Sequence, residues 1–369
     1  MRVPSPIALA AAALFVGASV APSMASVVKH PPVSPAFQMN IIPKVMTRAQ
    51  ALKYMNPSAA IPRVHEMGMR YARTHRPDLS KIHRDGKTPG LWLTDDAGYI
   101  WGLKKPGKGK VGTYLTDCSG AEGGVISPSG ALVVACTNTS TVNVYNAGNN
   151  SGPADAVLDD TPGFYPAAAF TDAAGNIYAT NLYGFSCTTY YCYFYPGNVV
   201  EWYTSNQGNG ASPSATITDP NMYEVYFGTA DASGNLYIDG FNNSFIPAVD
   251  QLHNGNSIPL AISPHFPGGL TVSNAGQLGV NDQGDYGSGD GSFTLYTLPS
   301  LGVAFQGAFP QNLNLLCDPV AVNLDGANAN AYSGDAGCHA AASLSIPGGT
   351  GGDALNINFD VPIAGIPTT

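Results

Sequence analysis

The chain has 369 residues and a formal net charge of −9, and all 16 of its Lys and Arg residues lie at or before Lys110. The stretch 111–369 holds 20 of the 25 Asp and Glu residues and no Lys or Arg, so its formal charge is −20. This acidic stretch cannot bind nucleic acid by displacing counterions from phosphates, and the basic part has no aromatic stacking motif. We therefore expect no nucleic-acid partner.

The basic residues are concentrated near the N-terminus, where 15 basic and 5 acidic residues between 26 and 110 give a net charge of +10. One interpretation is adaptation to acidic surroundings, in which protonated carboxylates leave the rest of the chain almost uncharged. The other is an intramolecular clasp, in which the basic segment lies on the acidic part. We favour adaptation, because shifts in composition more often reflect the surroundings than a designed site.

The first 25 residues predict a secretory signal peptide. Arg2 gives a minimal positive start, Ile7–Ala21 an apolar core, and Ser23-Met24-Ala25 a cleavage site of small residues. The apolar core is too short to span a bilayer, and no later stretch reaches about 18 uninterrupted apolar residues. We expect a secreted monomer, extracellular or periplasmic, without a membrane span.

Residues 26–88 form a basic N-terminal extension that differs in character from the rest of the chain. The stretches Thr47–Tyr54 and Pro62–Arg73 have helical spacing of their apolar residues, and Pro62 suits the first turn of a helix. We predict a partly helical extension with one or two short helices, serving as a pro-segment or a cap.

From residue 89 the chain repeats one phrase, in which an apolar stretch is followed by a polar turn with Gly and a second apolar stretch. The copies are LWLTDDAGYIWG (91–102), GVISPSGALVVA (124–135), AAFTDAAGNIYAT (168–180), FGTADASGNLYIDG (227–240), LTVSNAGQLGV (270–280) and PVAVNLDGANANAY (319–332). Each copy predicts a β-hairpin whose turn uses a glycine at positive φ. The turn glycines are Gly98, Gly130, Gly175, Gly234, Gly276 and Gly326.

A unit of this kind, repeated about every 40–50 residues, is typical of a β-propeller. We predict an all-β fold over 89–369, a six-bladed β-propeller with four-stranded blades; five or seven blades stay open. Such rings usually close when one terminus completes the blade that the other began, and we assign this role to Asp353–Asp360.

Six cysteines follow the signal peptide, which predicts disulfides in an oxidising compartment. Their positions within the repeats narrow the pairing. Two pairs occupy matching places in two units, and the third pair lies in one loop. The predicted bonds are Cys118–Cys136, Cys187–Cys192 and Cys317–Cys338.

The phrases DAAGNIYAT, DASGNLYIDG and VSNAGQLGV resemble NHL-type repeats and the six-bladed lactonase-like group that includes gluconolactonase and regucalcin. The resemblance covers about 89–360 and implies a propeller. In that group a Glu in an E-G-P phrase, with Asn and Asp from other blades, holds one divalent ion. Here Glu122 matches the Glu of that phrase, but the Pro is missing. Asn181 and Asp239 match the positions of the other ligands only loosely.

Oxygen atoms that converge on a propeller axis would suit Ca²⁺ or another hard cation. The residues proposed as ligands are Glu122, Asn181 and Asp239, and the function that they imply is a metal-dependent, lactonase-like hydrolysis. The competing interpretation, which we favour, is that Asp and Asn at strand ends form local turns.

The segment 182–197, LYGFSCTTYYCYFYPG, is the longest insertion and is rich in aromatic residues. These are Tyr183, Phe185, Tyr190, Tyr191, Tyr193, Phe194 and Tyr195. In a loop held by a disulfide, aromatic faces can bind a sugar ring or a protein with little loss of entropy. The alternative is that they only pack over the edge of the disc.

Nucleophile and phosphate-binding motifs are absent from the sequence, including G-x-S-x-G, H-E-x-x-H and the P-loop. Our first hypothesis is therefore a secreted binding or scaffold module, which engages a glycan or an extracellular protein through the aromatic loop and an acidic channel face. The metal-dependent hydrolase is the alternative hypothesis.

Overall fold

The computed structural model describes residues 44–47, 79–82, 86–95, 98–105, 110–283, 291–308, 319–335, 340–346, 351–355 and 362–368. Within these ranges the chain is almost entirely β-strand, with the short 3-10 helices η3 (Leu79–Lys81), η4 (Thr137–Thr139) and η5 (Thr204–Asn206). None of the described helices is long and apolar enough to cross a membrane. The predicted signal peptide, and the predicted helices apart from Thr47, lie outside the described residues.

Four sheets contain four strands each. One is β25 (Pro362–Pro367), β2 (Leu91–Asp95), β3 (Tyr99–Leu103) and β4 (Val111–Leu115). The next is β13 (Met222–Ala230), β14 (Leu236–Asn242), β15 (Pro247–His253) and β16 (Asn256–Pro259). The third is β17 (Pro267–Val272), β18 (Gln277–Asp282), β19 (Ser292–Thr297) and β20 (Gly302–Ala308). The fourth is β21 (Pro319–Leu324), β22 (Asn330–Asp335), β23 (Ala340–Ser345) and β24 (Gly351–Leu355).

A nine-stranded sheet holds the remaining strands. One part is β5 (Ala121–Ile126), β6 (Leu132–Cys136), β7 (Thr141–Tyr145) and β8 (Ala156–Asp159). The other is β9 (Phe164–Thr171), β10 (Ile177–Cys187), β11 (Tyr191–Trp202), β12 (Ala215–Ile217) and β1 (Lys44–Thr47). A single parallel pair, Gly123 with Ala168, joins the two parts.

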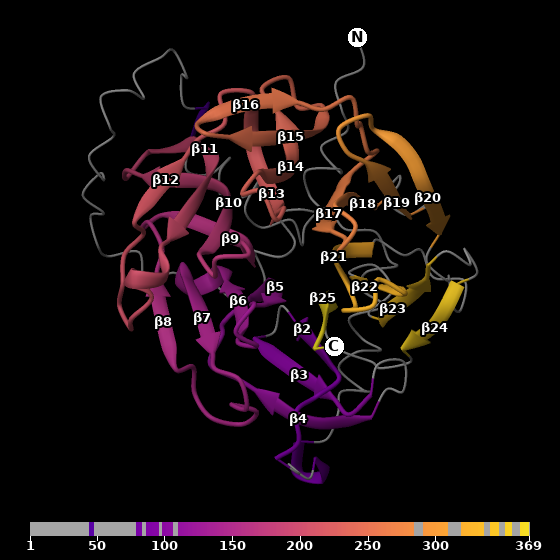
Figure 1. The fold of residues 1–369 in the computed structure, drawn as a ribbon. Coiled ribbons are helices and arrows are strands. Elements are labelled where there is room, and N and C mark those ends of the chain that lie inside the picture. The colour runs from indigo at the N-terminus through magenta and orange to yellow at the C-terminus, as the bar shows by residue number, and fades with distance from the viewer. Residues whose placement is uncertain are drawn as a thin grey trace.

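The sheets radiate from a common axis, as Figure 1 shows. Strands β25, β5, β9, β13, β17 and β21 lie next to the axis, and each contacts the next in a closed ring. Apolar side chains fill the space between neighbouring sheets; Val133, Leu158, Val200 and Trp202, for example, are fully buried in one cluster. This radial stacking of small sheets is the architecture of a β-propeller.

The C-terminal strand closes the ring. β25 pairs with β2, from Leu91 opposite Pro367 to Asp95 opposite Pro362. The closing role that we assigned to Asp353–Asp360 is therefore wrong, because the described part of that segment belongs to β24, which pairs with β23. The fourth strand of a sheet is its outermost strand, so further residues are needed for the chain to return to the axis.

The six predicted hairpins are all present. Gly98, Gly130, Gly175, Gly234 and Gly276 have positive φ, between 71° and 90°. In the last turn Asn328, with φ 51°, takes the place predicted for Gly326, and its N–H donates to the Asp325 carbonyl at 2.8 Å. The first hairpin also occupies a different place in its sheet from the other five. Because β25 is the inner strand there, the Gly98 turn joins the second and third strands of the sheet.

The turn phrase itself has a hydrogen-bonding explanation. Asp231 Oδ1 accepts the backbone N–H of Asn235 at 2.9 Å, and Oδ2 accepts the Asn235 amide at 2.7 Å and the Tyr237 hydroxyl at 3.0 Å. Asp172 makes the same three bonds to Asn176 and Tyr178. The recurring D-x-x-G-N-x-Y is thus a turn clamp, in which an Asp side chain accepts hydrogen bonds from donors of its own hairpin.

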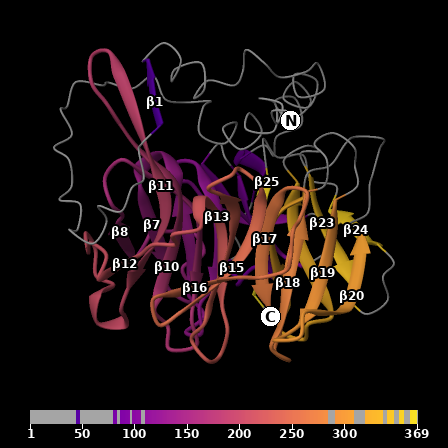
Figure 2. The ribbon, with the colours of Figure 1, turned by 90° about the horizontal axis from the view of Figure 1, so that it is seen from above.

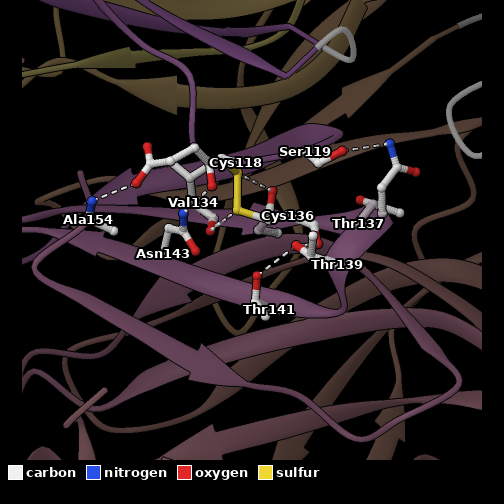
Figure 3. Close-up of a disulfide and its surroundings, with 12 residues drawn as sticks. Cys118, Ser119, Val134, Cys136, Thr137, Thr139, Thr141, Asn143 and Ala154 are labelled. Carbon is white, nitrogen blue, oxygen red and sulfur yellow. Dashed lines mark hydrogen bonds between the residues drawn. A yellow bond between two sulfur atoms is a disulfide. The ribbon is translucent and has the colours of Figure 1, made fainter. Parts of the chain in front are cut away.

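Two of the three predicted disulfides are present. Cys118–Cys136 (S–S 2.03 Å) ties the loop before β5 to the end of β6, with both cysteines fully buried (Figure 3). Cys187–Cys192 (S–S 2.02 Å) joins β10 to β11. Cys317 and Cys338 lie outside the described residues.

Candidate functional site

The predicted aromatic loop is a long β-hairpin. β10 and β11 pair from Ile177–Trp202 out to Cys187–Cys192. β9 supports β10 only as far as Gly184, so the hairpin continues past the neighbouring strand. Figure 2 shows it rising above the disc. Tyr, Phe and Thr, which favour strands, make up much of 182–196, and the extended pairing makes the segment a projecting arm.

The aromatic side chains of this arm fall into two groups. Tyr183 and Phe194 are buried, with ring centroids 5.7 Å apart, and Tyr183 also contacts Tyr165 at 5.4 Å. At the tip, Tyr190 is 73% exposed and Tyr191 is 47% exposed. Tyr193 and Tyr195 are half-buried, and the Phe185 side chain is outside the described part of the chain. The packing interpretation therefore holds for the first group, while the tip tyrosines face solvent.

The tip is held in one conformation by covalent and polar contacts. The Cys187–Cys192 disulfide closes it across the strands. Thr188 Oγ1 accepts the backbone N–H of Tyr191 at 3.0 Å and lies 3.4 Å from that of Tyr190, while the Thr188 N–H donates to the Tyr191 carbonyl at 2.7 Å. Side chains on such a preorganised tip lose little further entropy on binding.

The N-terminal extension contributes a strand to this arm, which the sequence did not predict. β1 runs antiparallel to β11, with Lys44 opposite Phe194 and Thr47 opposite Tyr191. Our expectation that a helix starts at Thr47 is wrong, since Thr47 ends β1. The local signal was weak: Val45 and Thr47 favour strands, but four residues are too few to outweigh the helical spacing that follows.

Glu122 lies on the inner strand β5. It is buried in a cavity of about 30 Å³ that is mainly apolar. The lining residues include Tyr165, Leu182, Tyr226, Phe266 and Gln283. Ligand-binding pockets usually measure about 300–1,000 Å³, so this cavity has room for one or two water molecules or a single ion.

Asn181 does not line that cavity. Its Nδ2 donates to Asn198 Oδ1 at 2.9 Å and to Asp160 Oδ1 at 3.3 Å. Asp160 Oδ2 and Asn181 Oδ1 are buried and accept no hydrogen bond from the described part of the chain. Burial raises the pKa of Asp160 to about 7, although hydrogen bonds from Thr161 and Asn181 lower it. Burial thus extends the pH range over which Asp160 is protonated.

Asp239 joins two sheets. Oδ1 accepts the N–H of Phe227 at 2.8 Å and Oδ2 that of Gly269 at 3.0 Å. Burial raises its pKa to about 7, against the lowering effect of these two bonds. Two other buried hydrogen bonds also join neighbouring sheets. Thr180 Oγ1 on β10 donates to the Tyr226 carbonyl on β13 at 2.7 Å, and Asn281 Nδ2 on β18 donates to Ser333 Oγ on β22 at 3.2 Å.

Of the three proposed metal ligands, only Glu122 lines the cavity of about 30 Å³. Both oxygens of Asp239 accept backbone N–H groups, so an ion held by all three residues would have to replace a bond of Asp239. Among the described residues, no group of three His, Cys, Asp or Glu side chains is arranged to hold a metal. The metal site stays a prediction from the resemblance.

A second cavity opens at the other end of the inner strands, beside the repeated turns. Its volume is about 340 Å³, which falls within the range of ligand sites. Thr229, Thr271 and Asn323 contribute polar groups to its wall. The Asn323 amide donates across the channel to the carbonyls of Gly365 at 3.1 Å and Gly124 at 3.3 Å, so it links inner strands.

A scan against protein-family models and a search of curated proteins gave no match. Among solved structures, the chain is similar to one in a nidogen/laminin complex, with a TM-score of 0.54 and 14% identity over 76% of this chain and 98% of that chain. It is also similar to a protein of unknown function from Bacteroides caccae, with a TM-score of 0.53 and 12% identity over 75% and 97% of the two chains. A virginiamycin B lyase from Staphylococcus aureus gives a TM-score of 0.44 and 16% identity over 70% and 82%. The similarity to the chain of the nidogen/laminin complex confirms the resemblance to NHL-type propellers, for the fold alone.

Proposed function

We propose that the chain is a secreted, six-bladed β-propeller that binds an extracellular protein through the tip of the β10–β11 hairpin. The propeller is the rigid support, and the hairpin is the binding element. The exposed pair Tyr190 and Tyr191 on a cross-linked tip is the observation that carries this proposal.

The blade count follows if the nine-stranded sheet is divided at its weakest point. β5 and β9 share only the Gly123–Ala168 pair, which is what two inner strands that approach each other at the axis would give. Division there yields two further four-stranded units, with β1 as an addition to one of them. Two disulfides in the described chain fit an oxidising compartment, in line with secretion.

The shape of the tip favours a protein over a glycan as ligand. Small ligands and sugar rings are usually held in concave sites, where most of their surface is buried. Here the tyrosines stand on a projecting arm (Figure 2), which can insert into a concave surface of a partner, as long loops of some binding proteins do. Tyrosine is suited to this role because it offers a large amphipathic face with few rotatable bonds.

Photo-cross-linking tests the proposal. p-Benzoylphenylalanine is placed at position 190 and, as a matched control, at Tyr203, which is 45% exposed but lies beside η5, away from the tip. Each protein is irradiated in culture medium of the producing organism. We expect a discrete cross-linked protein from position 190 only. The double variant Tyr190→Ala/Tyr191→Ala, immobilised without the cross-linker, should no longer retain that protein.

Retention on purified polysaccharides that disappears in the double variant would identify a glycan instead and would overturn the choice of a protein ligand. Equal cross-linking from positions 190 and 203, with unchanged retention by the double variant, would contradict any role for the tip.

A further inference from the structure

One edge of the projecting arm is a strand-binding site that the chain itself occupies. β10 pairs with β11 along one edge, so β1 and β12 both lie on the other edge. β12 covers that edge only from Val199 to Glu201, close to the disc. From Tyr191 to Phe194, above the disc, the backbone partner is β1. An edge of this kind readily accepts an extended peptide.

We infer that residues 44–47 act as an intramolecular clasp on this edge, and that cleavage beside the clasp releases the edge for a strand of a partner protein. β1 has only four residues and reaches the arm from a segment about 145 positions earlier in the chain, so local sequence contacts do not hold it there. The inference adds regulation to the proposed function, since Thr47 lies opposite the exposed Tyr191.

Charge complementarity supports an occupant from this chain. Residues 26–88 hold 11 basic and 3 acidic residues, a net charge of +8, and residues 89–369 hold 4 basic and 22 acidic residues, a net charge of −18, so the extension and the disc attract each other. Because the clasp is tethered, its effective concentration at the edge is high, and a weak four-residue pairing can stay occupied. The clasp interpretation of the charge asymmetry thus gains a defined point of attachment.

The distribution of basic residues provides a release mechanism. Lys44 lies in the clasp and Arg48 directly follows it, whereas no Lys or Arg occurs beyond Lys110. A Lys- or Arg-specific protease would hydrolyse the peptide bond after either residue, with one water added across that bond, and would leave 111–369 uncut. The same enzyme therefore removes the clasp and spares most of the propeller.

Hydrogen exchange on the full chain tests the clasp without any ligand. The variant Val45→Pro/Met46→Pro removes two backbone donors from β1, and Val45→Ile/Met46→Leu is the matched control. The Tyr191 N–H is bonded to Thr188 on the other side of β11, so the amides that alternate with it, those of Cys192 and Phe194, face β1. We expect these two amides to exchange at least about fivefold faster in the proline variant, the change for one net hydrogen bond. Equal exchange in all three proteins would overturn the clasp.

A peptide of residues 40–51 (NIIPKVMTRAQA) tests whether the released edge accepts a strand. It should bind the proline variant at least about tenfold more tightly than the unaltered chain, whose edge is occupied in cis. A peptide with prolines at the two substituted positions should bind neither protein. Failure of the first peptide to bind the proline variant would overturn the strand-binding site.

A dimer of the unaltered chain that disappears in the proline variant would show that β1 crosses to a second copy, and would overturn the intramolecular assignment. These measurements are independent of the tyrosines. The clasp can therefore fail while the tip still binds a partner, and the tip can fail while the clasp is found.

Discussion

Asp239 and Gly269 belong to different sheets and are joined by a hydrogen bond of 3.0 Å, from the Gly269 N–H to the Asp239 carboxylate. The other oxygen of the carboxylate accepts the Phe227 N–H of its own sheet. One buried side chain thus satisfies two backbone donors and sets the position of two inner strands. The residue that the family resemblance assigned to a metal has a structural task in the described fold.

Asp239→Asn should destabilise the protein by about 2 kcal/mol, because an amide has one acceptor oxygen and leaves a buried N–H without a partner. Asp159→Asn is the matched control, since Asp159 is exposed. Urea unfolding of both variants measures the difference. A loss for Asp239→Asn no larger than that of the control would show that the two bonds contribute little.

Stability should fall as the pH rises from about 4 to about 7. Burial raises the pKa of Asp160 and Asp239 to about 7. Burial, with repulsion from Asp219, raises the pKa of Asp250 to about 6. These folded-state pKa values exceed the unfolded value near 4, so the folded chain binds more protons in this window and loses stability as they dissociate. Thermal unfolding from pH 3 to pH 8 measures the profile.

Asp160→Asn should reduce that decline, because its amide stays neutral at every pH. We expect this variant to gain stability relative to the unaltered chain at pH 8 but not at pH 4. A parallel pH profile for the two proteins would exclude Asp160 as a cause. An acid optimum would also agree with the adaptation interpretation of the charge asymmetry.

The turn clamp of Asp231 has the opposite pH dependence. Burial tends to raise the pKa of Asp231, but hydrogen bonds from Asn235, Tyr237 and Ser233 outweigh it and lower the pKa overall. Its contribution is therefore present above the unfolded pKa and lost as the pH falls through the folded value. Asp231→Ala should cost about 2 kcal/mol at pH 6 and less at pH 3. A loss of the same size at both pH values would contradict a role for the ionised carboxylate.

Trypsin should remove the N-terminal part and leave a fragment that begins at Val111 and extends to the C-terminus, even after reduction and denaturation, because the enzyme requires Lys or Arg. Mass spectrometry of the fragment checks this expectation. In the native protein, the cut after Arg48 should be faster in Val45→Pro/Met46→Pro than in the unaltered chain; the bond after Lys44 is not compared, because trypsin does not cleave before proline. Equal rates would count against protection by β1.

The predicted metal site is tested by unfolding with and without a chelator, and with added Ca²⁺. A bound ion stabilises the folded state by mass action, so chelation should lower the Tm and Glu122→Gln should abolish that effect. No response in the unaltered chain would rule out the hydrolase hypothesis that depends on this ion.

The hairpins could be predicted because their causes are local. Alternating apolar residues, a glycine at positive φ and the Asp–Asn–Tyr clamp all lie within about ten residues, as around Gly234. The pairing Cys118–Cys136 followed from the position of each cysteine within its repeat. The prediction failed in the last turn, where Asn328 takes the positive φ in place of Gly326 and one extra residue separates Asp325 from Asn330.

The sequence by itself determined the all-β repeat, two disulfides of the described chain and the separation of charge, since each depends on composition or on neighbours in the chain. Only the tertiary structure decided that β25 closes the ring, that Asp239 links two sheets, and that β1 covers the arm beside Tyr191. These contacts join segments tens to hundreds of residues apart. Their energy depends on which backbone groups remain unpaired after the sheets have stacked, and local patterns in the chain do not encode that.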